Sequence, residues 1–159
     1  MTNAYLNHPW TRYVALGGSF TESIGDPEPE SVGGNRGWAE RVAEVLSDGQ
    51  PNFSYANLAV RGKMLSQISG EQVEPVLQLR PDLITISAGG NDVIRPGTDP
   101  DNIEARFDDV ISRLSRSRAT IVPFTGPISG SHHFFGACGE KSRSTTRTCA
   151  LRQRGTAAW

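Results

Sequence analysis

Short apolar runs alternate with longer amphipathic segments along most of the chain. Buried strands are predicted where an apolar run is bounded by Gly, Pro or polar residues, which occurs at residues 12–17, 53–60, 82–87 and 119–124. Apolar residues at helical spacing predict helices over 38–46, 64–79 and 100–114. Strands that alternate with helices in this way predict an α/β fold with a parallel sheet covered on both faces.

The three predicted helices carry different signals. Residues 100–114 give the clearest pattern, with Asp99 and Asp101 marking the start of the helix. Its expected buried face consists of Ile103, Phe107, Val110, Ile111 and Leu114. In the first helix the residues at helical spacing are Trp38, Val42, Val45 and Leu46. Gly70 and Pro75 break the pattern of the second helix.

Three polar loops follow three of the predicted strands. They contain Gly17-Gly18-Ser19, Arg61-Gly62 and Gly89-Gly90-Asn91-Asp92. In a parallel sheet the carboxyl ends of the strands share one edge, and binding sites form there. The sequence therefore predicts that Ser19, Gly62 and Asn91 lie at the same edge.

These residue types suit nucleophilic catalysis on a carbonyl group. A serine on a sharp turn after a strand exposes its hydroxyl, and its backbone N–H can face a developing oxyanion. Gly62 lets the backbone approach a substrate closely, and Asn91 offers a side-chain amide donor. Taken singly, each sequence is also a good turn with no chemistry required. The joint placement at three strand ends favours a site.

The composition indicates one globular domain. The chain has 159 residues, 36% of them hydrophobic and 21% charged, with a formal net charge of -1. No apolar run is long enough to span a membrane, and the first residues lack a positive region followed by an apolar stretch. We therefore expect a cytoplasmic protein.

The last part of the chain differs from the rest. Residues 129–159 contain five Lys and Arg, one Glu and both cysteines, with few apolar residues and no clear periodicity. This composition predicts an irregular or disordered tail after a domain at residues 1–128. The basic tail is more typical of a solvated segment than of a nucleic-acid-binding one, so no nucleic-acid partner is expected.

The order of the three loop sequences, ALGGSFTES, NLAVRG and SAGGND, resembles the SGNH (GDSL) hydrolase family over residues 12–128. The resemblance implies a three-layer α/β/α sandwich with a flavodoxin-like sheet, and hydrolysis of small-molecule esters. It also implies Ser19 as the nucleophile, and Ser19 N–H, Gly62 N–H and Asn91 as the oxyanion hole. No metal or organic cofactor is implied.

The chain departs from the family pattern in two places. Gly18 stands where the family's first block usually has Asp, which removes a carboxylate beside the nucleophile. The family's last block, Asp-x-x-His after a fifth strand, has no counterpart, because no Asp follows Asp109. The last strand and helix of the fold are therefore expected to be missing, and the serine lacks its usual general base.

The only other histidines besides His8 are His132 and His133, which follow the fourth predicted strand. Either is a possible substitute base, although no Asp stands near to orient it. Together with Cys138 and Cys149 they match no familiar zinc spacing, so no metal site is expected.

A change of reading frame offers one explanation of the tail. Arg outnumbers Lys 14 to 2 in the chain, as expected of a GC-rich gene. Shifting plausible GC-rich codons for Phe135 to Thr156 by two bases yields a helix-forming peptide. The hypothesis is a C-terminally truncated or frame-shifted family member. Two functions follow: an impaired serine ester hydrolase, or a non-catalytic remnant of such an enzyme.

Overall fold

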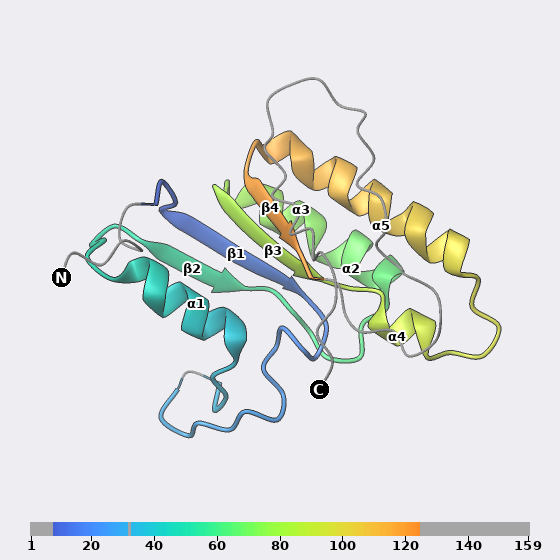
Figure 1. Cartoon of the computed structure of the whole chain (residues 1–159), viewed down its shortest axis with the longest axis horizontal. Helices are drawn as coiled ribbons and strands as arrows, with labels where there is room; N and C mark the ends of the chain where they lie inside the picture. The colour runs from blue at the N-terminus through green and yellow to red at the C-terminus, as the bar shows by residue number, and fades with distance from the viewer. Residues whose placement is uncertain (1–7, 32, 125–159) are drawn as a thin grey trace, which may run out of the picture.

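The computed structural model describes residues 8–31 and 33–124. Its four strands form one parallel sheet in the order β2-β1-β3-β4, and in Figure 1 all four arrows point the same way. The strands are β1 (Arg12–Gly17), β2 (Ser54–Asn57), β3 (Leu83–Ser87) and β4 (Thr120–Pro123). The predicted α/β class and parallel sheet are confirmed, whereas the expected absence of a last strand and the predicted tail concern residues outside those described.

Five α-helices connect the strands in the described part of the chain. They are α1 (Trp38–Ser47), α2 (Leu65–Glu71), α3 (Val73–Gln78), α4 (Gly90–Val93) and α5 (Pro100–Leu114). The pattern broken by Gly70 and Pro75 is resolved as two helices that meet at Gln72. The sequence did not predict α4, and β2 is shorter than the predicted strand at 53–60. Beyond β2 the chain still runs beside β1, since Leu58 N–H donates to Ala15 and Val60 N–H to Gly17.

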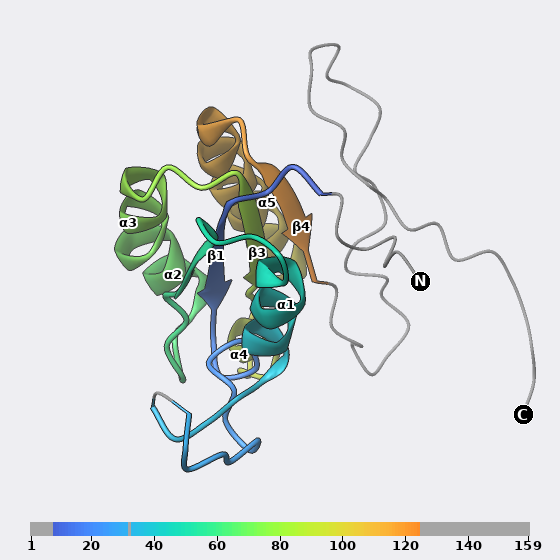
Figure 2. The same ribbon diagram turned by 90° about the vertical axis from the view of Figure 1, so that its left-hand side faces the viewer.

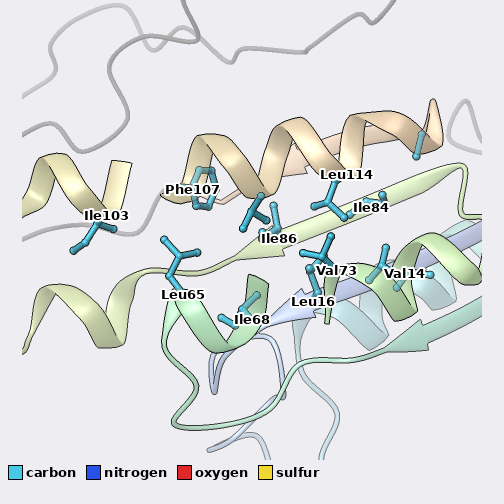
Figure 3. Packing of buried hydrophobic residues seen from close by; sticks show 13 residues of the cluster. Val14, Leu16, Leu65, Ile68, Val73, Ile84, Ile86, Ile103, Phe107 and Leu114 are labelled. Atoms are coloured by element: carbon cyan, nitrogen blue, oxygen red, sulfur yellow. The ribbon is translucent and has the colours of Figure 1, made fainter. Parts of the chain in front are cut away.

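The two faces of the sheet build two hydrophobic cores. Alternate strand residues point to opposite faces, so Val14, Leu16, Ile84 and Ile86 pack with the buried side chains of α2, α3 and α5. Figure 3 shows this larger core between the sheet and the helices. Tyr13, Ala15 and Leu83 face the other way, toward α1. Figure 2 shows α1 on one side of the sheet and α2 and α3 on the other.

The buried face of α1 differs from the predicted one. Ala39 and Ala43 are buried, whereas Val42 is 37% and Val45 59% exposed. Trp38 and Leu46 are half-buried against the smaller core, as expected. Two alanines toward the sheet let the helix approach closely, and the larger valines are left on the solvent side.

The loops at the amino-terminal edge of the sheet are held by Asp82. Its carboxylate accepts hydrogen bonds from the N–H groups of Thr11 and Arg12 at 2.8 and 2.9 Å and from the Thr11 hydroxyl at 2.8 Å. This anchors the start of β1 beside β3. Among the described residues, no helix has both the length and the apolarity needed to cross a membrane.

Candidate active site

The turn after β1 presents Ser19 at the carboxyl edge of the sheet. Gly17 ends the strand with a φ of 146°, and a Cβ on it would lie 2.2 Å from the carbonyl oxygen of Ser87. Gly18 N–H donates to that oxygen at 3.3 Å, and Gly18 O accepts from Thr21 and Glu22. The close approach of β1 to β3 at Gly17 therefore requires glycine, and it sets the direction in which Ser19 leaves the strand.

Ser19 is half-buried, and its hydroxyl and backbone N–H make no hydrogen bond to any other described residue. Its carbonyl accepts from Ile24 N–H at 3.3 Å, which closes the turn behind it. The hydroxyl and the N–H are available to a ligand from the same residue.

The second loop passes next to this turn. The Glu22 carboxylate accepts from the backbone N–H of Arg61 and pairs with its guanidinium, with Nε 3.2 Å from Oε2. Gly62 follows, exposed, with a φ of 73° and no atom within 4 Å of a Cβ placed on it. Its N–H has no acceptor within residues 8–31 and 33–124. The loop is thus anchored at Arg61 and offers an open N–H one residue later.

The third loop is tied to the second by two hydrogen bonds. Asn91 Nδ2 donates to Lys63 O at 3.0 Å, and the buried Asp92 carboxylate accepts from Leu65 N–H at 2.8 Å. A Cβ on Gly18 would lie 3.7 Å from Asn91 Nδ2, which places the amide beside the Ser19 turn. The side-chain amide nitrogen of Asn91 carries two hydrogens, and one is bound to Lys63 O, so the other remains as a donor for a ligand. The structure therefore brings together the three loops that carry Ser19, Gly62 and Asn91.

No histidine in the described part of the chain lies near Ser19. His8 precedes β1 at the opposite edge of the sheet, where its Nε2 lies 2.9 Å from Leu46 O and its ring stacks on Trp10. His132 and His133, the possible substitute bases, lie outside the described residues. No cluster of three or more His, Cys, Asp or Glu side chains suited to a metal ion occurs in the described ranges.

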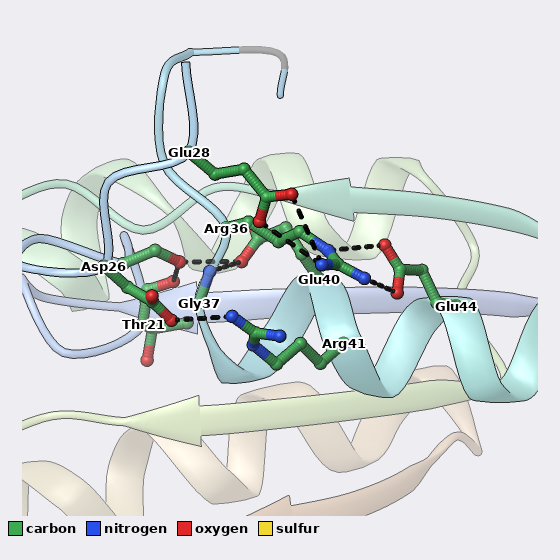
Figure 4. Close-up of polar contacts among 9 residues, drawn as sticks. Thr21, Asp26, Glu28, Arg36, Gly37, Glu40, Arg41 and Glu44 are labelled. Carbon is green, nitrogen blue, oxygen red and sulfur yellow. Dashed lines mark hydrogen bonds and ion pairs between the residues drawn. The ribbon is translucent and has the colours of Figure 1, made fainter. Parts of the chain in front are cut away.

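Glu40 of α1 is a half-buried carboxylate that supports the turn holding Ser19. The sequence pattern did not predict this role. It accepts from Ser23 Oγ at 2.6 Å, Tyr55 OH and Asn57 Nδ2 at 2.9 Å, and Gly37 N–H at 3.1 Å. Asn57 Nδ2 also donates to Thr21 O at 2.8 Å, which links the network to the turn that holds Ser19. Figure 4 shows Glu40 and Gly37 at the start of the helix.

These contacts shift the acid–base properties of the network. Burial alone raises the pKa of Glu40, but the hydrogen bonds from Ser23, Asn57 and Tyr55 outweigh it, so the pKa lies below the ordinary carboxyl value. Burial and the negative Glu40 raise the pKa of Tyr55. Glu40 is therefore ionised at neutral pH and acts as an acceptor. The only signal for Glu40 in the sequence is its place in the first turn of α1. That signal does not indicate burial, because an acidic residue there also suits an exposed helix start.

The described residues of the segment between the Ser19 turn and α1, 25–31 and 33–37, are held against that helix by ion pairs. Arg36 pairs with Glu28 at 3.2 Å and with Glu44, and Arg41 pairs with Asp26 at 3.3 Å (Figure 4). The Arg36 hydrogen bonds lower the pKa of the Glu44 carboxyl. These pairs hold Asp26, Glu28 and Arg36 of this segment in place beside the Ser19 turn and the helix.

Aromatic side chains lie beside Ser19. The Phe20 ring, 61% exposed, stacks on Trp38 with centroids 5.8 Å apart, and Phe124 contacts both rings at 6.3 and 4.2 Å. Trp38 Nε1 donates to Phe20 O at 3.1 Å. The chain therefore leaves β4 next to the residue that follows Ser19.

Comparison with protein families gives one match. The model of the GDSL-like lipase/acylhydrolase family matches residues 15–157. The match extends past residue 128, and the division of the chain at that residue stays a prediction. No curated protein matches the chain.

Several solved structures share the fold. A structure of TesA has a TM-score of 0.59 at 18% identity, over 70% of this chain and 58% of that one. The SGNH-hydrolase family esterase AlinE4 gives 0.57 at 21% identity, over 70% and 57%. A catalytic mutant of Axe2, an acetylxylan esterase from Geobacillus stearothermophilus, gives 0.60 at 20%, over 71% and 58%. The chain thus spans less than two thirds of the length of these proteins.

Proposed function

The chain belongs to the family of GDSL-like lipases and acylhydrolases, and on this premise we propose that it hydrolyses small-molecule carboxylic esters with Ser19 as the nucleophile. The observation that carries the proposal is the convergence of three loops around Ser19. Two of these loops hold backbone N–H groups, at Ser19 and Gly62, that have no acceptor among the described residues, and the third holds the tethered amide of Asn91.

The proposed reaction proceeds in two halves. Ser19 Oγ attacks the ester carbonyl carbon and gives its proton to a base, and the carbonyl oxygen becomes an oxyanion. The N–H groups of Ser19 and Gly62 and the second amide hydrogen of Asn91 donate to that oxyanion. The alkoxide then leaves with the proton, and water attacks the acyl-serine to release the acid and free Ser19.

The oxyanion donors are held before any ligand arrives. Lys63 O fixes one hydrogen of the Asn91 amide, and Glu22 fixes Arg61 next to Gly62. Donors that need no reorganisation contribute most to catalysis, and the loss of one costs on the order of 10²–10³ in rate.

We assign the general base to His132 or His133. The support is the path of the chain, since Phe124 contacts Phe20, the neighbour of Ser19. His132 lies eight positions after Phe124, which at about 3.3–3.6 Å per position allows a reach of up to roughly 26–29 Å. A histidine within that reach can accept the Ser19 proton.

The second candidate function is a binding protein that holds ester-like ligands without turnover. It is favoured by the absence of a histidine beside Ser19 within the described ranges. In this case the oxyanion donors still bind a carbonyl or carboxylate, but Ser19 is not activated.

Hydrolysis of p-nitrophenyl acetate and butyrate by the purified chain distinguishes the two functions. Ser19→Ala should lower kcat by about 10³-fold or more, whereas Ser66→Ala, an exposed serine on α2, should have no effect. Equal rates for the wild type and Ser19→Ala would overturn the hydrolase proposal in favour of the binding protein.

The same assay tests the base. A His132→Ala, His133→Ala double variant should lose activity as Ser19→Ala does, and the single variants show which histidine acts. His8→Gln, at the opposite edge of the sheet, is the matched control. An active enzyme that is indifferent to the double variant would refute this assignment and leave the nucleophile intact.

A further inference from the structure

Gln72 makes a two-point hydrogen bond to the strand residue that precedes the Ser19 turn. Gly17 N–H donates to Gln72 Oε1 at 2.9 Å, and Gln72 Nε2 donates to Gly17 O at 3.0 Å. Gln72 lies between α2 and α3 and is 4% exposed. One buried side chain thus satisfies both backbone polar groups of Gly17.

The geometry of the sheet explains why a side chain is needed here. β2 ends at Asn57, which pairs with Ala15. No strand residue of β2 therefore lies opposite Gly17 to accept a hydrogen bond from its N–H. Val60 N–H still reaches Gly17 O at 3.1 Å, but the carboxamide of Gln72 supplies the acceptor for Gly17 N–H. The side-chain amide takes the place of a peptide group of a neighbouring strand.

Gly17 is therefore held from two sides. On the β3 side, Gly18 N–H is bound to Ser87 O, and a Cβ on Gly17 would collide with that oxygen. On the helical side, Gln72 fixes the Gly17 backbone groups. These two contacts consequently fix the orientation of the peptide groups that lead into Ser19.

We propose that Gln72 is a positioning residue for the Ser19 hydroxyl and N–H, acting through the backbone of Gly17. This inference rests on the proposed hydrolase function. An oxyanion donor and a nucleophile on the same residue must both be placed correctly, and a displacement of about 1 Å can cost on the order of 10²-fold in rate. A residue that fixes the turn two positions earlier controls both.

The test compares Gln72→Met with Tyr13→Phe. Methionine keeps the length of the side chain and removes both hydrogen bonds. Tyr13 is buried on the opposite face of the sheet, where its hydroxyl lies 2.9 Å from Thr85 Oγ1, so Tyr13→Phe removes a buried hydrogen bond from the same strand without touching the turn. Both variants are expected to unfold at a lower temperature than the wild type.

Ester hydrolysis well below the unfolding temperature separates positioning from stability. Gln72→Met should lower kcat by about 10- to 100-fold with KM within about twofold of the wild type, because the turn moves and the rest of the pocket does not. Tyr13→Phe should keep its kcat. A kcat for Gln72→Met no lower than that of Tyr13→Phe would overturn the proposal.

Amide NMR spectra give a reading that needs no turnover. In Gln72→Met the Gly17, Gly18 and Ser19 amide signals should shift, and Gly17 N–H should exchange with solvent faster, whereas Tyr13→Phe should leave the Gly18 and Ser19 signals in place. If the wild type proves inactive, these shifts alone decide the positioning role, and the hydrolase proposal fails separately. Unchanged Ser19 signals in Gln72→Met would overturn the inference in either case.

Discussion

Gly17 is the residue at which the sheet and the candidate site impose the strictest requirement. Its φ of 146° is strained for other residues, and its missing side chain makes room for the Ser87 carbonyl. At Gly49, after α1, the φ of 71° is also positive, but a Cβ there would meet no atom within 4 Å. The two glycines therefore separate the cost of backbone conformation from the cost of a steric clash.

We expect Gly17→Ala to lower the free energy of unfolding by at least about 2 kcal/mol, because the clash with a backbone oxygen adds to the conformational strain. Gly49→Ala carries only the strain and should cost about 1 kcal/mol. Urea unfolding followed by circular dichroism measures both. Equal losses in the two variants would mean that β1 and β3 separate easily at Gly17.

The charge of Glu40 gives the protein a pH-dependent contribution to stability. Since hydrogen bonds lower its pKa in the folded state below the ordinary value of 4.5, its stabilising effect is present above that value. The effect is lost as the pH falls through the folded-state pKa. Glu40→Gln removes the charge while keeping the shape of the side chain.

At pH 7 we expect Glu40→Gln to be less stable than the wild type by about 1–2 kcal/mol, the usual scale of hydrogen bonds to a charged acceptor. The gap should narrow as the pH is lowered from about 5 toward 3, because the wild type then loses its own carboxylate. Denaturant titrations at several pH values measure this gap. A constant gap over that range would contradict a lowered pKa.

At the level of elements, α5 begins where the sequence predicts a helix N-terminus. Asp99 caps the helix by accepting from Asp101 N–H at 3.0 Å, and Pro100 occupies the first turn. Four of the five residues of its expected face, all except Ile111, are fully buried. The predicted and observed bounds agree because local capping and the apolar period point to the same helix.

Asp99→Ala should therefore destabilise the protein by about 1 kcal/mol, since the Asp101 N–H loses its acceptor. Asp108→Ala, on the exposed middle of α5, removes the same charge without a cap and should change stability by no more than about 0.5 kcal/mol. Thermal unfolding of both variants makes the comparison. Matching shifts in Tm would show that charge, rather than capping, determines the effect.

Local sequence patterns predict only part of these elements. Strands, their order along the chain and the loops of Ser19, Gly62 and Asn91 follow from apolar runs and glycines, which are local signals. Helix α4 was missed because Gly90, Asn91 and Asp92 also suit a turn. The exposed Val42 and Val45 of α1 show that apolar spacing alone does not select the buried face when alanines permit closer packing.

Gln72 and Glu40 were missed for a related reason. A polar residue within a helical segment is ordinarily exposed, and its burial depends on partners that are distant in sequence. Gly17 lies 55 residues before Gln72, and Asn57 lies 17 residues after Glu40. Such buried polar contacts are specified by tertiary structure, and they are the contacts that support the Ser19 turn.

At the scale of the whole molecule, β4 is one of the two edge strands of the sheet in the described part of the chain. Within the described residues β4 pairs only with β3, so no described residue bonds to the backbone groups of its other edge, and Val122 is 37% exposed. An apolar edge strand is a template for pairing with a second chain. This arrangement predicts association through β4.

Val122→Lys should reduce this association, because a charge on an edge strand opposes pairing with another copy. Light scattering during incubation at high protein concentration measures the rate of aggregation, and Tm should change little because the side chain is already partly exposed. Val45→Lys, on the exposed face of α1, adds the same charge away from the edge. If aggregation through β4 dominates, only Val122→Lys slows it. Equal slowing by both variants would instead attribute the effect to net charge, and the β4 edge would not be the site of contact.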